Sequence, residues 1–140
     1  MKILVAVDGS RHTKRMLAYL AAHDEWRTVQ HRYTVITVVP PIPSRAAVVV
    51  ANDTLNAYYD REAENVLRPI RVFLGKQGVS ADFVGKTGNP AEAIAASAVK
   101  GKFDLLMMGS HGHSTLANLV LGSVATKVMA QCRTPVLLIR

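Results

Sequence analysis

Hydrophobic residues of this chain gather in short continuous runs, and longer stretches of mixed polar and apolar residues separate these runs. A short apolar run is typical of a strand that is buried on both faces of a parallel sheet. Five strands are predicted on this basis, the third from a weaker pattern: Ile3–Val7, Val35–Val39, Ala81–Val84, Leu105–Met108 and Val136–Ile139.

The intervals between the runs carry apolar residues at helical spacing, together with residues that begin or end helices. The expected helices run from the cap Ser10 to about His23, from Asp53 or Asn56 to about Gly75, from Asn89 and Pro90 to Lys100, and onward from Ser123. This alternation predicts an α/β fold. We expect one doubly wound domain over residues 1–140, with a five-stranded parallel sheet in the order 3-2-1-4-5 and helices on both faces.

Two segments do not fit regular elements. Pro69 lies inside the second helical pattern, where a proline removes one hydrogen bond at a cost of ~3 kcal/mol, so that helix is expected to bend or to consist of two pieces. Three prolines preclude regular structure at the start of Pro40–Asn52. The apolar run at its centre is interpreted as a mobile flap, in preference to a surface that faces a partner.

A glycine-rich loop follows the fourth predicted strand, with glycines at Gly109, Gly112 and Gly122 and then Ser123. Glycine allows positive φ and close approach of a ligand, so such a loop can turn several N–H groups inward around an anion. The helix that begins at Ser123 adds the partial positive charge of its N-terminus. The segment therefore predicts a phosphate site, although two glycines alone would more often only turn the chain.

The spacing of all three glycines and Ser123 is a more specific signal than two glycines alone. Gly109, two residues, Gly112, nine residues, and Gly122 with Ser123 resemble the nucleotide-binding signature of the universal stress protein family. The segments MKILVAVDGS, TGNPAEAI and TPVLLIR resemble corresponding segments of that family in the same order, so the resemblance covers essentially all 140 residues.

This resemblance implies an ATP-binding universal stress protein that acts as a stress-response regulator or sensor. It implies that Asp8 contacts the ribose, that the backbone of Val38 contacts adenine, and that the glycines and Ser123 contact the phosphates. The complete expected cofactor site is Asp8, Val38, Met108, Gly109, Gly112, His113, Gly122, Ser123 and Val124.

Asp8 also has an interpretation that does not depend on the resemblance. Ligands of open α/β sheets bind beyond the carboxyl ends of the strands, where the strand order reverses. Asp8 ends the first predicted strand, so its carboxylate is well placed to accept hydrogen bonds from a ribose diol. The alternative is that Asp8 only caps the first helix together with Ser10.

No protein site for a metal is predicted, because the chain has no Asp or Glu from Leu105 onward. A magnesium ion that accompanies ATP would be held by phosphate oxygens and water, either alone or with help from Asp8. His111 and His113 flank Gly112, but two histidines without a third ligand are weak support for a metal site. We expect one or both to face solvent or to donate to a phosphate.

Catalytic residues are not predicted. The chain has no GxxxxGK[ST] loop and no acid placed to activate water, so a bound nucleotide is expected to be held, with at most slow ATP hydrolysis. A weak ATPase is thus one alternative. Another is a protein-interaction module of the same fold without functional nucleotide binding, against which the three intact glycines argue.

Composition and charge limit the other functional classes to which the protein could belong. The 17 Lys and Arg give a net charge of +7 but are scattered, and aromatic residues are only 6% of the chain, so nucleic-acid binding is disfavoured. No apolar run approaches the ~20 residues of a membrane span. Asp8 and Arg11 follow MKILVAV at once, unlike a signal peptide, so we expect a cytoplasmic location without membrane association.

The last predicted strand suggests an assembly. Pro135–Arg140 is apolar up to its final arginine and lies at the edge of the expected sheet, where unpaired backbone groups invite another strand. Pairing of two copies across a two-fold axis would cover this edge, and the family resemblance implies a similar homodimer. The alternative is a monomer in which Arg140 protects a short edge.

Overall fold

The computed structural model describes residues 1–113 and 121–140. Five parallel strands form one sheet in the order β3-β2-β1-β4-β5, which confirms the predicted fold class and strand order. They are β1 (Lys2–Ala6), β2 (Arg32–Val39), β3 (Ala81–Thr87), β4 (Leu105–Gly109) and β5 (Val136–Ile139). In the centre, Val5 of β1 lies between Val35 and Met107 in register.

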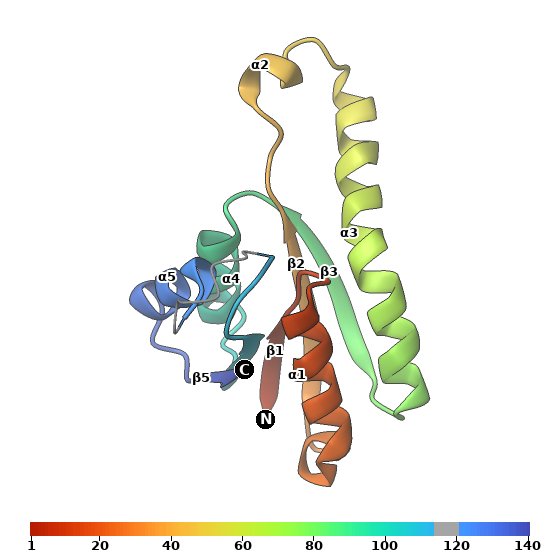
Figure 1. Cartoon of the computed structure of the whole chain (residues 1–140), viewed down its shortest axis with the longest axis vertical. Helices are drawn as coiled ribbons and strands as arrows, with labels where there is room; N and C mark the ends of the chain where they lie inside the picture. The colour runs from red at the N-terminus through yellow and green to blue at the C-terminus, as the bar shows by residue number, and fades with distance from the viewer. Residues whose placement is uncertain (114–120) are drawn as a thin grey trace.

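Helices cover both faces of the sheet, as the alternating pattern predicted (Figure 1). They are α1 (Arg11–Ala22), the short 3-10 helix η1 (Asp24–Arg27), α2 (Ser44–Ala47), α3 (Asn52–Lys76), α4 (Pro90–Lys100) and α5 (Ser123–Gln131). α1 and α3 pack on one face, and α4 and α5 on the other.

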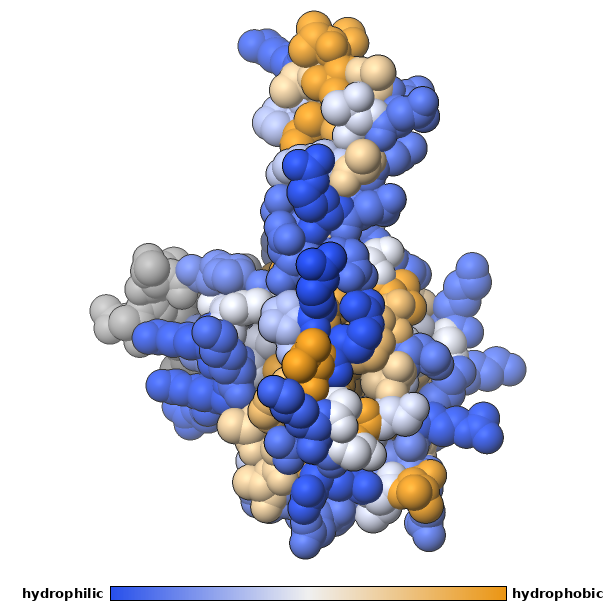
Figure 2. All heavy atoms as spheres, turned by 90° about the vertical axis from the view of Figure 1, so that its right-hand side faces the viewer, coloured by the Kyte–Doolittle hydropathy of each residue, from blue (hydrophilic) through white to orange (hydrophobic). Residues whose placement is uncertain are grey.

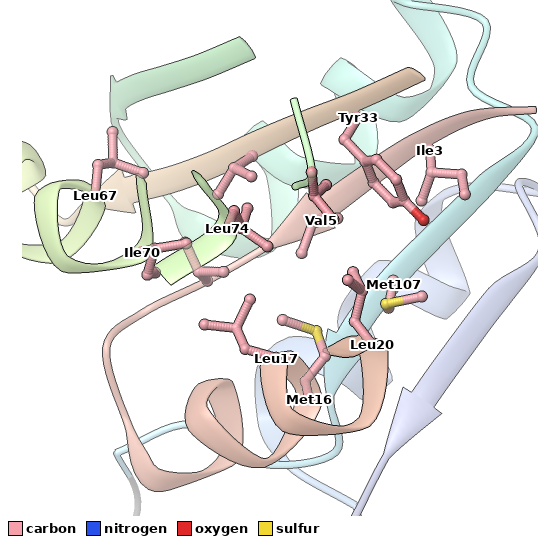
Figure 3. Close-up of a cluster of buried hydrophobic side chains, with 13 residues drawn as sticks. Ile3, Val5, Met16, Leu17, Leu20, Tyr33, Leu67, Ile70, Leu74 and Met107 are labelled. Carbon is pink, nitrogen blue, oxygen red and sulfur yellow. The ribbon is translucent and has the colours of Figure 1, made fainter. Parts of the chain in front are cut away.

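Alternate residues of β1 supply the two apolar layers. Ile3 and Val5 pack against α1 and α3, whereas Leu4 and Ala6 pack against α4 and α5. Figure 3 shows the first layer, in which side chains of α1 face those of α3 and β1. Because both faces of the strand are covered, every position must be apolar, and this explains the unbroken run that predicted the strand.

Local signals set the helix ends as expected. The side chain of Ser10 caps α1 by accepting from the N–H of Thr13, and that of Asn89 caps α4 by accepting from the N–H of Glu92. Pro90 takes the first position of α4, where its missing N–H has no cost.

The strand bounds agree with the prediction to within one residue except in two places. β2 begins three residues earlier, at Arg32, and β3 continues three residues further, to Thr87. β3 lies at an edge of the sheet and its side chains are exposed or half-buried. An edge strand needs no continuous apolar run, so its sequence signal was weak.

α3 runs unbroken through Pro69, so the expectation of two separate pieces is wrong. After Pro40–Pro43, which is irregular as predicted, the chain forms the short helix α2, which the pattern did not predict. α2 and the first half of α3 stand away from the sheet (Figure 1). Val48 and Val49 beside α2 are 85% and 83% exposed, and Figure 2 shows apolar side chains gathered at this tip.

Among the described residues, no helix combines the length and the apolar character needed to cross a bilayer.

Replacing Pro69 with Ala tests the cost of the proline inside α3. Pro69 is exposed, and alanine would restore the missing backbone donor, so Pro69→Ala should raise the free energy of unfolding by about 2 kcal/mol. Urea denaturation followed by circular dichroism measures the change. Arg61→Ala, at an exposed position of the same helix, is the control and should change stability by less than about 0.5 kcal/mol. Equal stability of Pro69→Ala and wild type would contradict the prediction.

Candidate functional site

A cavity of about 420 Å³ lies beyond the carboxyl ends of β1, β2 and β4, where the strand order reverses. Its size lies within the range of small-molecule sites. All of the predicted cofactor residues line it, brought together from three strand ends, the glycine loop and the start of α5: Asp8, Val38, Met108, Gly109, Gly112, His113, Gly122, Ser123 and Val124.

The backbone of Val38 faces this cavity because β2 is longer than β1. The regular pairing of the two strands ends at Ala6 with Ile36, and the N–H of Val7 still donates to the carbonyl of Ile36 at 2.9 Å. On the opposite edge of β2, the N–H of Gly88 donates to the carbonyl of Val39 at 3.1 Å. Backbone groups of successive residues alternate between the two edges, so the N–H and C=O of Val38 point to the side that β1 has left.

The two carboxylate oxygens of Asp8 differ in their hydrogen-bond partners. Oδ1 accepts from the N–H of Ser10 at 2.9 Å and from the hydroxyl of Thr13 at 2.8 Å, so Asp8 does stabilise the start of α1. Oδ2 accepts no hydrogen bond from the described part of the chain and lies beside Gly112, whose Cβ, if it had one, would be 2.8 Å away. The two interpretations of Asp8 from the sequence are therefore compatible, because each concerns a different oxygen.

Gly109 and Gly122 of the loop are required by the packing of the chain itself, whereas a Cβ at Gly112 would meet only the end of the Asp8 side chain. A Cβ at Gly109 would lie 2.8 Å from Cβ of His12, and one at Gly122 would lie 3.0 Å from the carbonyl oxygen of Ser110. None of the three has a positive φ. The loop therefore does not use the positive φ that glycine allows, and close approach between chain segments is the physical reason for Gly109 and Gly122.

The N-terminus of α5 forms one wall of the cavity and presents unpaired donors there. The first intrahelical hydrogen bond of α5 joins the N–H of Thr126 to the carbonyl of Gly122, so the N–H groups of Ser123, Val124 and Ala125 precede it. Gly122 has no side chain that could cap them, and no acidic residue lies in the first turn. The helix N-terminus can therefore receive an anion.

The histidines of the site are held by the protein. Nε2 of His113 donates to the backbone carbonyl of Asp8 at 2.7 Å, which ties the glycine loop to the end of β1 although the ring is exposed. Nδ1 of His111 and the hydroxyl of the buried Ser110 are in hydrogen-bond contact at 2.9 Å. Within the described ranges, no group of three His, Cys, Asp or Glu side chains could hold a metal ion.

His12 was not singled out in the sequence, because nothing in its neighbourhood showed that it would be buried. Only 7% of the residue is exposed, its ring centroid lies 5.1 Å from that of His111, and its Nδ1 has no partner in the part of the chain that the structure describes. Burial lowers the pKa of His12 below its ordinary value, and the charge of Arg11 acts in the same direction. Burial of His12 thus favours the neutral form of its imidazole.

The sequence also missed the contribution of α3. Glu62 and Val66 of that helix line the cavity, as do the buried Thr37 of β2 and Pro90 and Ile94 of α4. No local motif marks these positions. Their place in the site follows from helix packing on the sheet.

The fold and the cavity define a doubly wound α/β protein with a ligand site at its topological switch point. The family model described as "Universal stress protein family" matches residues 1–140. A universal stress protein of Thermus aquaticus is 35% identical to the chain over 138 residues, which are 99% of this chain and 97% of that protein. The chain therefore belongs to the universal stress protein family.

Solved structures agree with this assignment. MJ0577 of Methanocaldococcus jannaschii has a TM-score of 0.82 at 26% identity, with 99% of this chain and 94% of that chain covered. Two others share the fold and carry an adenine nucleotide. The universal stress protein of Archaeoglobus fulgidus in complex with dAMP has a TM-score of 0.67 at 23% identity, covering 100% and 98% of the two chains. A family protein of Arabidopsis thaliana with AMP bound has a TM-score of 0.70 at 17% identity, covering 99% and 90%.

The buried His12 predicts a pH dependence of stability. In the unfolded chain its imidazole has the ordinary pKa of 6.5, and in the folded protein the pKa is lower. Between these two values the unfolded state binds a proton that the folded state does not, so stability falls as the pH falls through this window.

His12→Phe keeps a flat ring against His111 and removes the titrating group. Urea unfolding between about pH 7.5 and about pH 5 should show that wild type loses more stability on acidification than this variant. Parallel pH profiles of the two proteins would exclude His12 as the cause.

Proposed function

We propose that this chain binds ATP in the cavity and acts as a stress-response regulator or sensor. The proposal depends on one observation. The free backbone groups of Val38, the second oxygen of Asp8 and the N-terminus of α5 line a single cavity, each with the chemistry that one part of a nucleotide needs. The solved relatives that carry AMP and dAMP support an adenine nucleotide as the ligand.

Each part of the nucleotide has a complement. The N–H of Val38 would donate to N1 of adenine, and its carbonyl would accept from the 6-amino group. Oδ2 of Asp8 would accept from a ribose hydroxyl. The free N–H groups at the start of α5 and the hydroxyl of Ser123 would donate to the phosphates. Gly109, Gly112 and Gly122 would lie against the phosphates, and Met108, His113 and Val124 would complete the walls of the site.

The ligand would be held, and turnover would be slow. No Lys or Arg is among the described residues that line the cavity. Its carboxylates, Asp8 and Glu62, lie in the turn after β1 and on α3 rather than in the wall formed by α5. A magnesium ion that accompanies ATP would take its ligands from phosphate oxygens and water. A weak ATPase remains the second candidate, and only positioning and the ion would drive its reaction.

Asp8→Asn tests the ribose contact without removing the helix cap, because the amide oxygen can replace Oδ1. The amide nitrogen would then replace Oδ2, and the acceptor for the ribose hydroxyl would be lost. We expect the Kd for ATP to rise about tenfold in isothermal titration calorimetry, while the Kd for inorganic tripolyphosphate stays the same.

Asp82→Asn is the matched control, since Asp82 is exposed on β3 outside the cavity. It should bind both ligands like wild type. If Asp8→Asn weakens the binding of ATP and of tripolyphosphate equally, Asp8 does not contact the ribose. If wild type binds no adenine nucleotide, the proposed function is refuted.

We also propose that the chain forms a homodimer through β5. All four residues of this edge strand are half-buried and apolar. The carbonyl of Pro135 accepts from Leu106 in β4, and that of Ile139 accepts from Ser110 directly after β4, so by alternation the backbone groups of Val136 and Leu138 point outward. A second copy, antiparallel across a two-fold axis, would pair these groups and cover the apolar side chains.

Leu138→Pro removes an outward donor and should convert the dimer into a monomer. Light scattering should give wild type twice the 15.2 kDa of one chain, and the variant about that single mass. Thr87→Pro places the same change at the outward side of the opposite edge strand β3 and should leave the dimer intact. A monomeric wild type would refute the assembly.

A further inference from the structure

Glu62 is an unused carboxylate in the wall of the cavity. It is half-buried on α3, and Asp8 is the other carboxylate among the described lining residues. No hydrogen bond or ion pair joins Glu62 to the described part of the chain. Glu64, two residues later on the same helix, is by contrast bonded to the guanidinium of Arg71 at 3.1 and 3.2 Å.

The packing of α3 sets the level of Glu62 along the sheet. Ala63 lies so close to β3 that a Cβ on Gly85 would be 2.7 Å from its own Cβ. Gly85 pairs in register with Thr37, the residue before Val38. Glu62 therefore enters the cavity at the level where the free backbone groups of Val38 lie.

One turn further along α3, Val66 packs over the turn between β1 and α1, 3.6 Å from where a Cβ of Gly9 would be. α3 thus follows the wall of the cavity from the end of β2 to the end of β1. The N-terminus of α5 lies on the other side, beyond β4 and on the opposite face of the sheet. The carboxylate and the anion-binding helix end are consequently placed on different sides of the cavity.

This separation indicates which end of a bound nucleotide lies near Glu62 and which lies near the N-terminus of α5. A carboxylate without a donor repels phosphate, and its partial burial is costly unless a ligand donates a hydrogen bond to it. In the proposed complex, the part of the nucleotide that lies at the level of Val38 is the base. The 6-amino group of adenine has two hydrogens, of which one would reach the carbonyl of Val38 and the other is available to a second acceptor.

We infer that Glu62 is a specificity-determining residue that accepts a hydrogen bond from the exocyclic amino group of the base, so that the site selects 6-aminopurine nucleotides. This inference rests on the proposed binding of ATP. A 6-oxopurine would present an oxygen to the carboxylate, and the two acceptors would repel each other. A site built around such a hydrogen bond rejects analogues that lack the donor far more strongly than a purely apolar pocket does.

The test compares ATP with ITP, in which an oxygen replaces the 6-amino group and N1 carries a hydrogen. Wild type should bind ATP at least tenfold more tightly than ITP in calorimetry. Glu62→Gln keeps the size of the side chain and adds a donor, so it should weaken the binding of ATP about tenfold and leave the binding of ITP unchanged or tighter. The ratio of the two Kd values should therefore fall at least about tenfold, and the remaining preference for ATP would come from the backbone of Val38.

Two control variants separate this role from others. Glu64→Gln changes a carboxylate of the same helix outside the cavity and should preserve the ratio. Asp8→Asn should weaken ATP and ITP equally, because both contain ribose. A structural role of Glu62 alone would change the two affinities together and leave their ratio intact.

The outcomes distinguish the two proposals. If wild type binds ATP and Glu62→Gln keeps the wild-type ratio, the role of Glu62 is refuted and nucleotide binding stands. If wild type binds GTP more tightly than ATP and Glu62→Gln removes that preference, Glu62 reads the 2-amino group of guanine and the adenine assignment is overturned. If wild type binds none of these nucleotides, both proposals fail.

Discussion

The early end of β1 is the constraint on which the rest of the cavity depends. β1 leaves the sheet after Ala6, while β2 continues to Val39, so one strand edge is exposed in the middle of the sheet. Asp8 makes this departure possible, because its Oδ1 holds the N–H of Ser10 and the hydroxyl of Thr13 and so starts α1 at once. The same short turn directs Oδ2 toward the glycine loop. A free strand edge, a carboxylate oxygen and a cavity thus arise from a single change of chain direction.

The glycine loop extends this constraint to the far side of the cavity. The loop approaches α1 so closely that a Cβ at Gly109 would lie 2.8 Å from Cβ of His12, and His113 is bonded to the carbonyl of Asp8. Gly122 is tied to the loop by its N–H, which donates to Ser110 at 2.7 Å. The start of α5 is therefore placed by the same contacts that close the end of β1. Interiors packed this tightly tolerate added volume poorly, so Gly109 and Gly122 are structural whether or not a ligand is bound.

Much of the fold could be predicted, because buried strands and capped helices leave local signals. The runs Ile3–Val7 and Leu105–Met108 marked central strands, and Ser10 and Asn89 marked helix starts. β3 and α2 were harder to predict, since an edge strand and a four-residue helix bury too few side chains to impose a pattern. In the site, the residues at strand ends and in the loop could be predicted. Glu62, Val66 and His12 could not, because their positions depend on how α3 and α1 pack.

By itself the sequence determined the order of strands and helices, the sheet order that its resemblance and alternation imply, and the residues that end the central strands. These depend on hydrophobic periodicity and on short-range capping, which are properties of neighbouring residues. Only the tertiary structure decided that α3 contributes a carboxylate to the cavity, that the two oxygens of Asp8 differ, and that Gly109 and Gly122 serve close packing without positive φ. Each of these depends on distances between segments far apart in the chain, and such distances are set only when the helices pack on the completed sheet.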